Sequence, residues 1–163
     1  MRVLVAIDDS PFSDVAIRAV AARPWPEGTE IRLMHAVEVP PMVSFTGAAW
    51  PDPPVDLSSI REAERARGTQ LLERAAEQFI RTSLKVSTRL IEGSARTTIL
   101  DEARTWPADL VVLGSHGSKG LTRFLLGSVS ETIVRHAPCS VEIIKAPTGN
   151  VATPQGGETN ARS

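Results

Sequence analysis

The stretch from Leu113 to Gly120 carries the residues best suited to binding chemistry. Its glycines at positions 114, 117 and 120 allow a backbone path with positive φ and close approach of a ligand. Gly127-Ser128 then opens a predicted helix, whose first amides are unpaired and whose dipole favours an anion. Lys119 and Arg123 add positive charge to the same loop. Together these residues predict a phosphate cradle, and a plain flexible loop remains the alternative.

This glycine-rich segment differs from two common phosphate-binding motifs. The Gly-Lys-Ser/Thr ending of a Walker loop is missing, and the spacing is not GxGxxG. Ser128 and Glu131 also match an S-x-x-E capping box, which is a structural role that needs no ligand. We favour the phosphate role for Ser128, because a capping box does not explain the glycines that precede it.

A second polar segment runs from Ala6 to Ser10 and contains Asp8 and Asp9. Both acids could simply stabilise the start of the following helix through its dipole, and we favour that role for Asp9. The three histidines are scattered, so they predict no metal site. We expect His116 to pack at the rim of the loop and Cys139 to be a small buried filler.

Five short apolar runs predict the strands that would position these segments: Val3 to Ile7, Ile31 to Val37, Val86 to Ile91, Leu110 to Leu113 and Ser140 to Ile144. Helical stretches lie between them. The first starts at Ser10-Pro11 and ends by Pro24, and the others cover about 58–81, 97–105 and 127–137. This alternation predicts an α/β fold with an open parallel sheet between two helical layers. Ligands of such sheets bind beyond the carboxyl ends of the strands.

Composition sets the class of protein. The 163 residues, 42% of them hydrophobic, fit one domain, and the net charge of −1 gives no basic surplus for nucleic-acid binding. No apolar run is long enough to span a membrane, so we expect a cytoplasmic protein. Residues 38–56, rich in proline and containing Phe45 and Trp50, are expected to form a mobile loop within a domain of residues 1–146. Residues 147–163 are expected to be a disordered tail.

Several motifs resemble those of the universal stress protein family. The series Gly114-x2-Gly117-x9-Gly127-Ser128 matches its G-x2-G-x9-G-(S/T) signature without a gap. Val5 to Ser10 is similar to the opening V-x-x-D-x-S, and Leu33 to Val37 is similar to the second strand, L-x-H-V. Ala137 to Val141 resembles A-x-C-P-V, with the proline displaced. The resemblance covers residues 1 to about 146.

The resemblance implies a Rossmann-like sheet of order 3-2-1-4-5 and an ATP site between strands 1 and 4. It places Asp8 by the adenosine, and the backbone of Ala36 or Val37 at the adenine edge. Gly114 and Gly117 would line the ribose and α-phosphate, while Gly127, Ser128 and Val129 would hold the outer phosphates. A Mg²⁺ or Mn²⁺ ion would ride on the phosphates. The full set of expected cofactor-binding residues is Ala6, Asp8, Ala36, Val37, Leu113, Gly114, Gly117, Gly127, Ser128 and Val129.

The function expected from these features is that of an ATP-binding stress-response module. We see no activated nucleophile with its base, so we expect no enzyme activity beyond slow ATP hydrolysis. The resemblance also implies a homodimer through the last strand, Val141 to Ile144, which would hide an apolar edge.

Three alternatives remain open. Asp8-Asp9, Ser115 and Lys145 suit a phosphoacceptor receiver domain, although the third strand ends in Ile91-Glu92 and not in aspartate. A nucleotide-using enzyme of a related adenosine-binding family would carry H-x-G-H or S-G-G-x-D-S after the first strand. The last alternative is a module of the same fold that dimerises without nucleotide.

Overall fold

The computed structural model describes residues 1–38, 57–117 and 126–145, and four helices alternate with five strands in them. The strands are β1 (Arg2–Ala6), β2 (Glu30–Val37), β3 (Lys85–Glu92), β4 (Leu110–Gly114) and β5 (Ser140–Ile144). The helices are α1 (Pro11–Ala22), α2 (Leu57–Glu77), α3 (Ala95–Thr105) and α4 (Ser128–His136). The expected loop at 38–56, apart from Glu38, and the expected tail at 147–163 lie outside the described residues, as do Lys119, Gly120 and Arg123.

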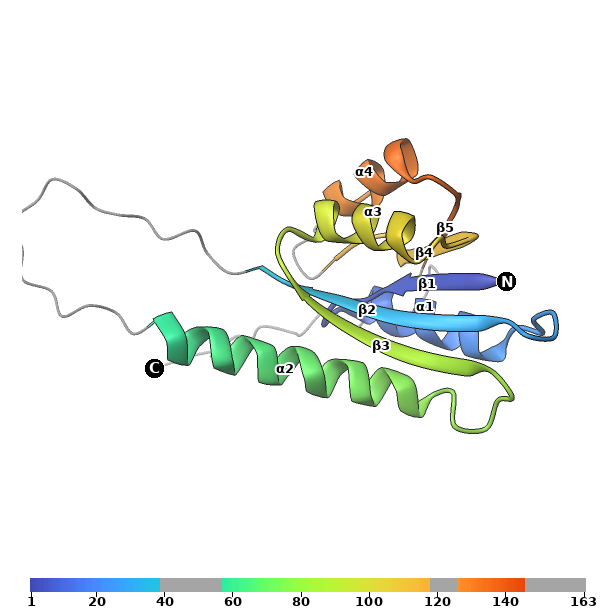
Figure 1. Cartoon of the computed structure of the whole chain (residues 1–163), viewed down its shortest axis with the longest axis horizontal. Coiled ribbons are helices and arrows are strands. Elements are labelled where there is room, and N and C mark those ends of the chain that lie inside the picture. Colours follow the sequence, from blue (N-terminus) through green and yellow to red (C-terminus); the bar gives the residue numbers. More distant parts are fainter. Residues whose placement is uncertain (39–56, 118–125, 146–163) are drawn as a thin grey trace, which may run out of the picture.

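All four strand pairings of the sheet are parallel, and the order is β3-β2-β1-β4-β5. This confirms the predicted α/β fold and strand order. Figure 1 shows α3 and α4 on one face of the sheet and α1 and α2 on the other. The carboxyl ends of β1 and β4 lie side by side, because Ala6 pairs with Leu113 in the register. The two segments that carry the candidate site residues therefore meet at one edge.

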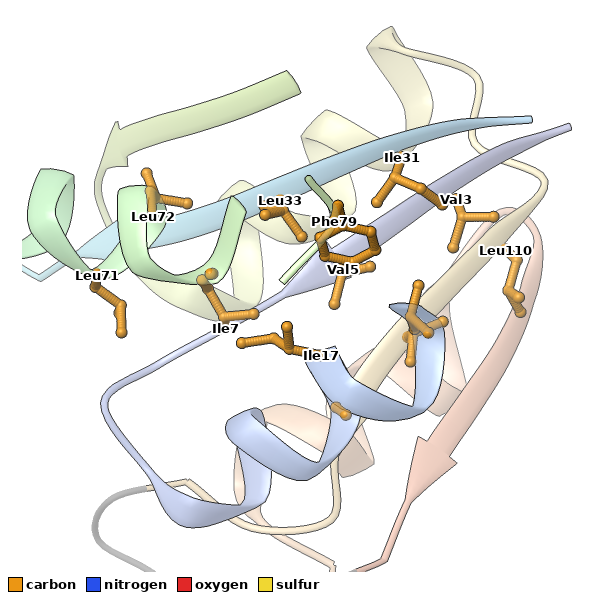
Figure 2. Close-up of a cluster of buried hydrophobic side chains, with 14 residues drawn as sticks. Val3, Val5, Ile7, Ile17, Ile31, Leu33, Leu71, Leu72, Phe79 and Leu110 are labelled. Carbon is orange, nitrogen blue, oxygen red and sulfur yellow. The ribbon is translucent and has the colours of Figure 1, made fainter. Parts of the chain in front are cut away.

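Side chains of β1 alternate between two apolar cores, which explains its uninterrupted apolar run. Val3, Val5 and Ile7 pack with α1 and α2, as Figure 2 shows. Leu4 and Ala6 face the other way and join the cluster under α3 and α4. Both faces of the central strand are thus shielded from water, and burial of this kind is the main favourable term in folding.

The ends of two helices differ from the predicted ones. α2 ends at Glu77, four residues before the predicted end, and Ile80 beyond it is 77% exposed. α3 begins at Ala95, two residues before the predicted start. Cys139 was also misjudged, because its side chain is only half-buried beside the core under α3 and α4.

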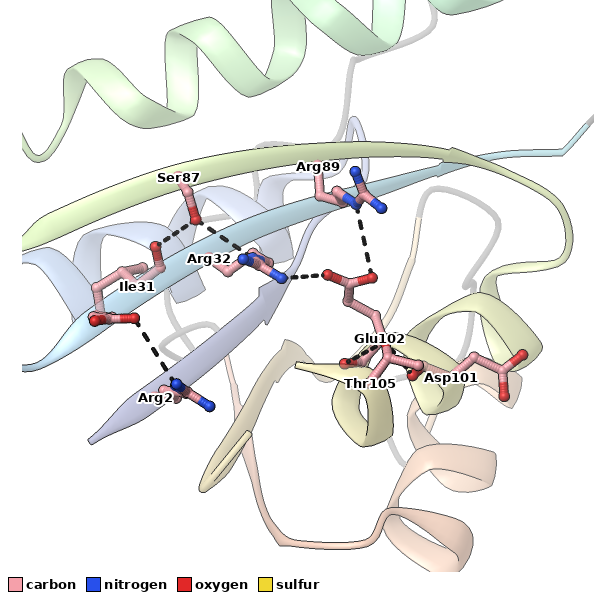
Figure 3. Close-up of polar contacts among 9 residues, drawn as sticks. Arg2, Ile31, Arg32, Ser87, Arg89, Asp101, Glu102 and Thr105 are labelled. Carbon is pink, nitrogen blue, oxygen red and sulfur yellow. Dashed lines mark hydrogen bonds and ion pairs between the residues drawn. The ribbon is translucent and has the colours of Figure 1, made fainter. Parts of the chain in front are cut away.

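A buried acid ties α3 to two strands (Figure 3). Glu102 is 6% exposed, and its carboxylate lies 2.7 Å from the guanidinium of Arg32 on β2 and 3.8 Å from that of Arg89 on β3. Arg32 also stacks over the Trp106 ring, 4.2 Å from its centroid. The buried charge is compensated by these cations, as a buried carboxylate requires.

Within the described ranges, no helix is both long and apolar enough to cross a bilayer.

Candidate functional site

One cavity of about 550 Å³ opens at the carboxyl ends of the central strands. Its volume lies within the range usual for small-molecule sites. All ten residues that the sequence predicts for the site line it: Ala6, Asp8, Ala36, Val37, Leu113, Gly114, Gly117, Gly127, Ser128 and Val129. Segments separated by more than a hundred residues are thus brought together around one space.

The carboxylate of Asp8 is oriented by two hydroxyl groups. The Ser10 and Ser13 hydroxyls donate to its Oδ1 atom at 2.5 and 2.6 Å, and the Ser13 hydroxyl accepts from the Asp8 amide at 2.9 Å. Asp9 points elsewhere. It is exposed, and its carboxylate lies 3.7 Å from Arg74 and 4.0 Å from Arg67, both on α2. Of the two acids, Asp8 lines the cavity.

Gly114 ends β4 and Gly117 lies in the loop after it. Both leave room for neighbouring atoms, and neither has a positive φ. Positive φ is found at Gly28 and Gly93 among the described glycines, so the expectation of positive φ at 114 and 117 is wrong. A Cβ at Gly114 would lie 2.9 Å from the Phe12 backbone, and one at Gly117 would lie 2.8 Å from Asp8 Oδ2. Close approach of the two loops is therefore what requires glycine here.

The start of α4 differs from the predicted capping box. Gly127 is the N-cap with a φ of −61°, and no side chain of the described residues caps the helix. Ser128 is the first helical residue, and Glu131 pairs with Arg135 at 2.9 Å. The capping box is therefore wrong, because Ser128 lies one position too late to cap. Gly127, Ser128 and Val129, at the start of α4, line the cavity instead.

Sequence reasoning missed the contribution of α2 and α3 to the cavity. Glu64 lines it from α2, and Arg96 and Ile99 line it from α3. The Ala95 amide at the start of α3 is 3.4 Å from a carboxylate oxygen of Glu38, which follows β2. The position of α3 after the carboxyl end of β3 was the available signal, because that end lies on the same edge of the sheet.

His116 contacts Phe12, and their ring centroids are 5.0 Å apart. Its Nδ1 atom lies 3.0 Å from the Ser115 hydroxyl, which is the spacing of a nucleophile and its base. Ser115, however, is 3% exposed and does not line the cavity. Among the described residues, no group of three or more His, Cys, Asp or Glu could hold a metal ion. The geometry is suited to holding an anion beside an organic group.

The family model described as the universal stress protein family matches residues 1–145. Universal stress protein YxiE of Bacillus subtilis is 30% identical over 146 residues, which are 88% of this chain and 98% of that protein. MJ0531 of Methanocaldococcus jannaschii is 30% identical over 119 residues, 72% of this chain and 66% of that protein. The chain thus spans just under two thirds of MJ0531 and nearly all of YxiE.

Solved structures share the fold. UspA from Lactobacillus plantarum gives a TM-score of 0.66 at 27% identity, over 88% of this chain and 97% of that one. An Arabidopsis thaliana family protein with AMP bound gives 0.65 at 22% identity, over 91% and 93%. A universal stress protein in complex with cAMP gives 0.58 at 19%, over 89% and 96%. With the matched family model and the gap-free glycine series at the cavity, the chain belongs to the universal stress protein family.

Proposed function

We propose that this chain binds ATP in the cavity and acts as a nucleotide-dependent regulatory module with little or no hydrolysis. One observation carries the proposal: the expected nucleotide-binding residues from β1, β2, β4 and α4 all line the same space. The AMP and cAMP complexes of the two relatives favour an adenine nucleotide in particular. ATP is the finer choice, because no side chain of the described residues caps α4, and its first amides can then bind further phosphates.

The phosphates belong at α4 in this proposal. Gly127 carries no side chain to block the helix start, and the Ser128 hydroxyl and the Val129 amide extend the donor set. The helix dipole favours negative charge at this end. Gly114 and Gly117 would then lie against the ribose and the α-phosphate.

The adenine edge belongs at the end of β2. The β1–β2 register ends at Ala6–Met34, and the Ile7 amide donates to the Met34 carbonyl at 2.8 Å. In a parallel strand, alternate residues turn their backbone groups to the same neighbour, so Ala36 turns its groups to the β1 side, beyond the last pairing. The Val37 carbonyl, in contrast, accepts from the Gly93 amide on the β3 side at 3.0 Å. Ala36 is therefore the better of the two candidates for adenine.

A divalent ion would be held by the phosphates in this arrangement, since Mg²⁺ usually keeps several waters and is bound by few carboxylates. We also propose a homodimer through β5, whose Val141, Ile143 and Ile144 are half-buried at the edge of the sheet. An unpaired strand edge of this kind is suited to pairing with a second copy. Sedimentation equilibrium of the full chain checks it, and a monomer mass at micromolar concentration would contradict it.

The deciding experiment is mass spectrometry of nucleotide released from freshly purified protein, followed by calorimetry with ATP. Gly117→Val is expected to weaken ATP binding by at least about tenfold, because overpacking of this size costs roughly 1–3 kcal/mol. Ala66→Val, on an exposed part of α2 outside the cavity, is the matched control and should bind as the wild type does. Equal affinities of wild type and Gly117→Val would remove Gly117 from the site.

Two further measurements test the rest of the proposal. A phosphate-release assay should show little or no turnover, and rapid hydrolysis would contradict a binding module. Hydrogen exchange with and without ATP should change in elements beyond the lining residues, as a regulatory role requires. A phosphoryl group added by acetyl phosphate and seen in the intact mass would instead favour the receiver alternative.

A further inference from the structure

We propose that His35 recognises the nucleobase, with its Nε2 atom accepting a hydrogen bond from the 6-amino group of adenine. The inference rests on the proposed function and adds a side-chain contact that selects the base. His35 lies on β2 next to Ala36, and it lines the cavity.

The protonation of the His35 ring follows from its backbone contact. Its Nδ1 atom lies 2.9 Å from the carbonyl oxygen of Ile7. A carbonyl oxygen can only accept, so Nδ1 must carry the proton in this contact. In the neutral ring, Nε2 is then left with a lone pair. The β1 backbone thus turns His35 into a hydrogen-bond acceptor toward anything that approaches Nε2.

The His35 ring is also fixed on a second edge. α2 passes close by at Gly68, where an added Cβ would lie 2.8 Å from His35 Cδ2 and 2.6 Å from Leu90 Cδ1. The absence of a side chain at Gly68 lets the helix approach the ring at that edge. A ring held at both Nδ1 and Cδ2 cannot turn freely, so the direction of its Nε2 lone pair is set before a ligand arrives.

The Nε2 atom is accessible. In the described part of the chain, His35 has no hydrogen-bond partner besides Ile7, and no buried side-chain nitrogen or oxygen lacks a partner. An Nε2 atom without a partner must therefore reach solvent, and His35 is among the residues that line the cavity. The atom is an oriented acceptor at the end of the site where adenine is expected.

Adenine presents a donor that suits this acceptor. Its 6-amino group donates hydrogen bonds, whereas unsubstituted purine offers none at that position. A site built to bond a donor rejects an analogue without it, since its own polar group is then left unpaired. Glu64 is a second acceptor on the same wall and is the competing explanation for any such preference.

The test compares ATP with purine riboside 5′-triphosphate, which lacks the 6-amino group, by calorimetry on the full chain. Wild type is expected to prefer ATP by about five- to tenfold, which is the value of one hydrogen bond. His35→Asn retains a donor for the Ile7 carbonyl but has no atom in place of Nε2, so it should bind both compounds within about twofold. Ala66→Val, outside the cavity, is the matched control and should keep the wild-type ratio. Glu64→Leu, which removes the competing acceptor, tests the other explanation.

A measurement on the wild-type protein tests the role of His35 without relying on the folding of any variant. With ¹⁵N-labelled histidine, the Nε2 resonance of His35 should shift on addition of ATP and stay unchanged with the purine analogue. Binding of ATP without preference over the analogue would overturn the role of His35 and leave the proposed function intact. A loss of preference in Glu64→Leu and not in His35→Asn would overturn the role of His35 and assign base selection to Glu64. A wild type that binds neither compound would overturn both proposals.

Discussion

The starts of α1 and α4 both lie at the edge of the sheet where the cavity opens, and they differ. At the start of α1, Ser10 is the N-cap, its hydroxyl accepts from the Ser13 amide at 3.2 Å, and Pro11 takes the first helical position. The same hydroxyl donates to Asp8. At the start of α4, the N-cap is Gly127, and no side chain of the described residues bonds to the helix amides.

The difference shows how one edge can serve both stability and binding. Unpaired amides at a helix start attract negative charge in either case. At α1 the Ser10 hydroxyl accepts from a helix amide and in turn donates to the Asp8 carboxylate, so a partner is supplied within the protein. At α4 the protein supplies none among the described residues, and the first helical residues line a cavity. Of these two helix starts, that of α4 is therefore the one that the described residues leave available to a ligand.

Supplying α4 with a cap should have the largest effect. Gly127→Asp puts a carboxylate at the N-cap, and the added Cβ meets a nearest atom at 3.4 Å, so the backbone can accept it. We expect ATP affinity to fall by about tenfold or more, because the carboxylate occupies the amides and repels phosphate. We also expect stability to rise by about 1 kcal/mol relative to Gly127→Ala.

Calorimetry and urea unfolding of Gly127→Asp and Gly127→Ala check both effects. The alanine variant adds the same Cβ without a cap. Unchanged ATP binding in the aspartate variant would show that the phosphates do not lie at α4.

Removing one hydroxyl from each helix start should give two smaller effects. The change at α1 should lower stability, and the change at α4 should weaken ATP binding. Ser10→Ala removes the cap of α1 and should lower the free energy of unfolding by about 1 kcal/mol, with ATP affinity nearly unchanged. Ser128→Ala removes no cap and should leave stability within about 0.5 kcal/mol while weakening ATP binding. Thermal melts and titrations of both variants test the pair, and a loss of stability in Ser128→Ala would mean that its hydroxyl caps the helix after all.

The smallest effect concerns the far end of α1, where Arg23 is the C-cap. Its guanidinium donates to both carboxylate oxygens of Glu142 on β5, at 2.8 and 2.5 Å, and this bond holds the pKa of Glu142 below its usual value of 4.5. A depressed folded-state pKa contributes stability above pH 4.5 that is lost as the pH falls through the folded-state pKa. Because the pair is about one-third exposed, we expect only about 0.5 kcal/mol from Glu142→Gln at neutral pH.

Urea unfolding of Glu142→Gln at neutral and acidic pH measures that contribution. The difference from wild type should shrink below pH 4.5. Glu131→Gln, which breaks an exposed pair on α4 with Arg135, is the control and should show a smaller difference at every pH. A pH-independent deficit in Glu142→Gln would indicate a packing effect and not an ion pair.

Much of the fold was predictable because its signals are local. Apolar runs gave all five strands to within one residue, and Ser10-Pro11 gave the start of α1. The predicted end of α2 is too late because the helix stops where its packing stops, whereas the sequence pattern continues past that point. Ile80 illustrates this, because it is apolar and yet almost fully exposed. The start of α3 differs by two residues, which is the ordinary uncertainty of a helix boundary.

The sequence predicted which residues line the candidate site better than it predicted the role of each residue. Ten residues chosen by motif line one cavity, but the positive φ expected of the glycines and the alternative role of Ser128 in a capping box were wrong. Whether Gly117 is needed for positive φ or for the approach of Asp8 depends on a neighbour more than a hundred residues away. Glu64 was missed because no local pattern specifies where α2 lies above the edge, whereas the position of Arg96 at the start of α3, after the carboxyl end of β3, was an available signal.

The sequence by itself determined the alternation of strands and helices, the family, and the residues at the carboxyl ends of β1 and β4, because periodicity and spacing act along the chain. Only the tertiary structure decided which helix start remains uncapped, which acid faces the cavity and which nitrogen of His35 is left to accept. Those outcomes depend on a donor and an acceptor meeting across the sheet, as His35 and Ile7 do over 28 residues of sequence. Hydrogen bonds need distances near 3 Å, and only packing brings distant residues that close.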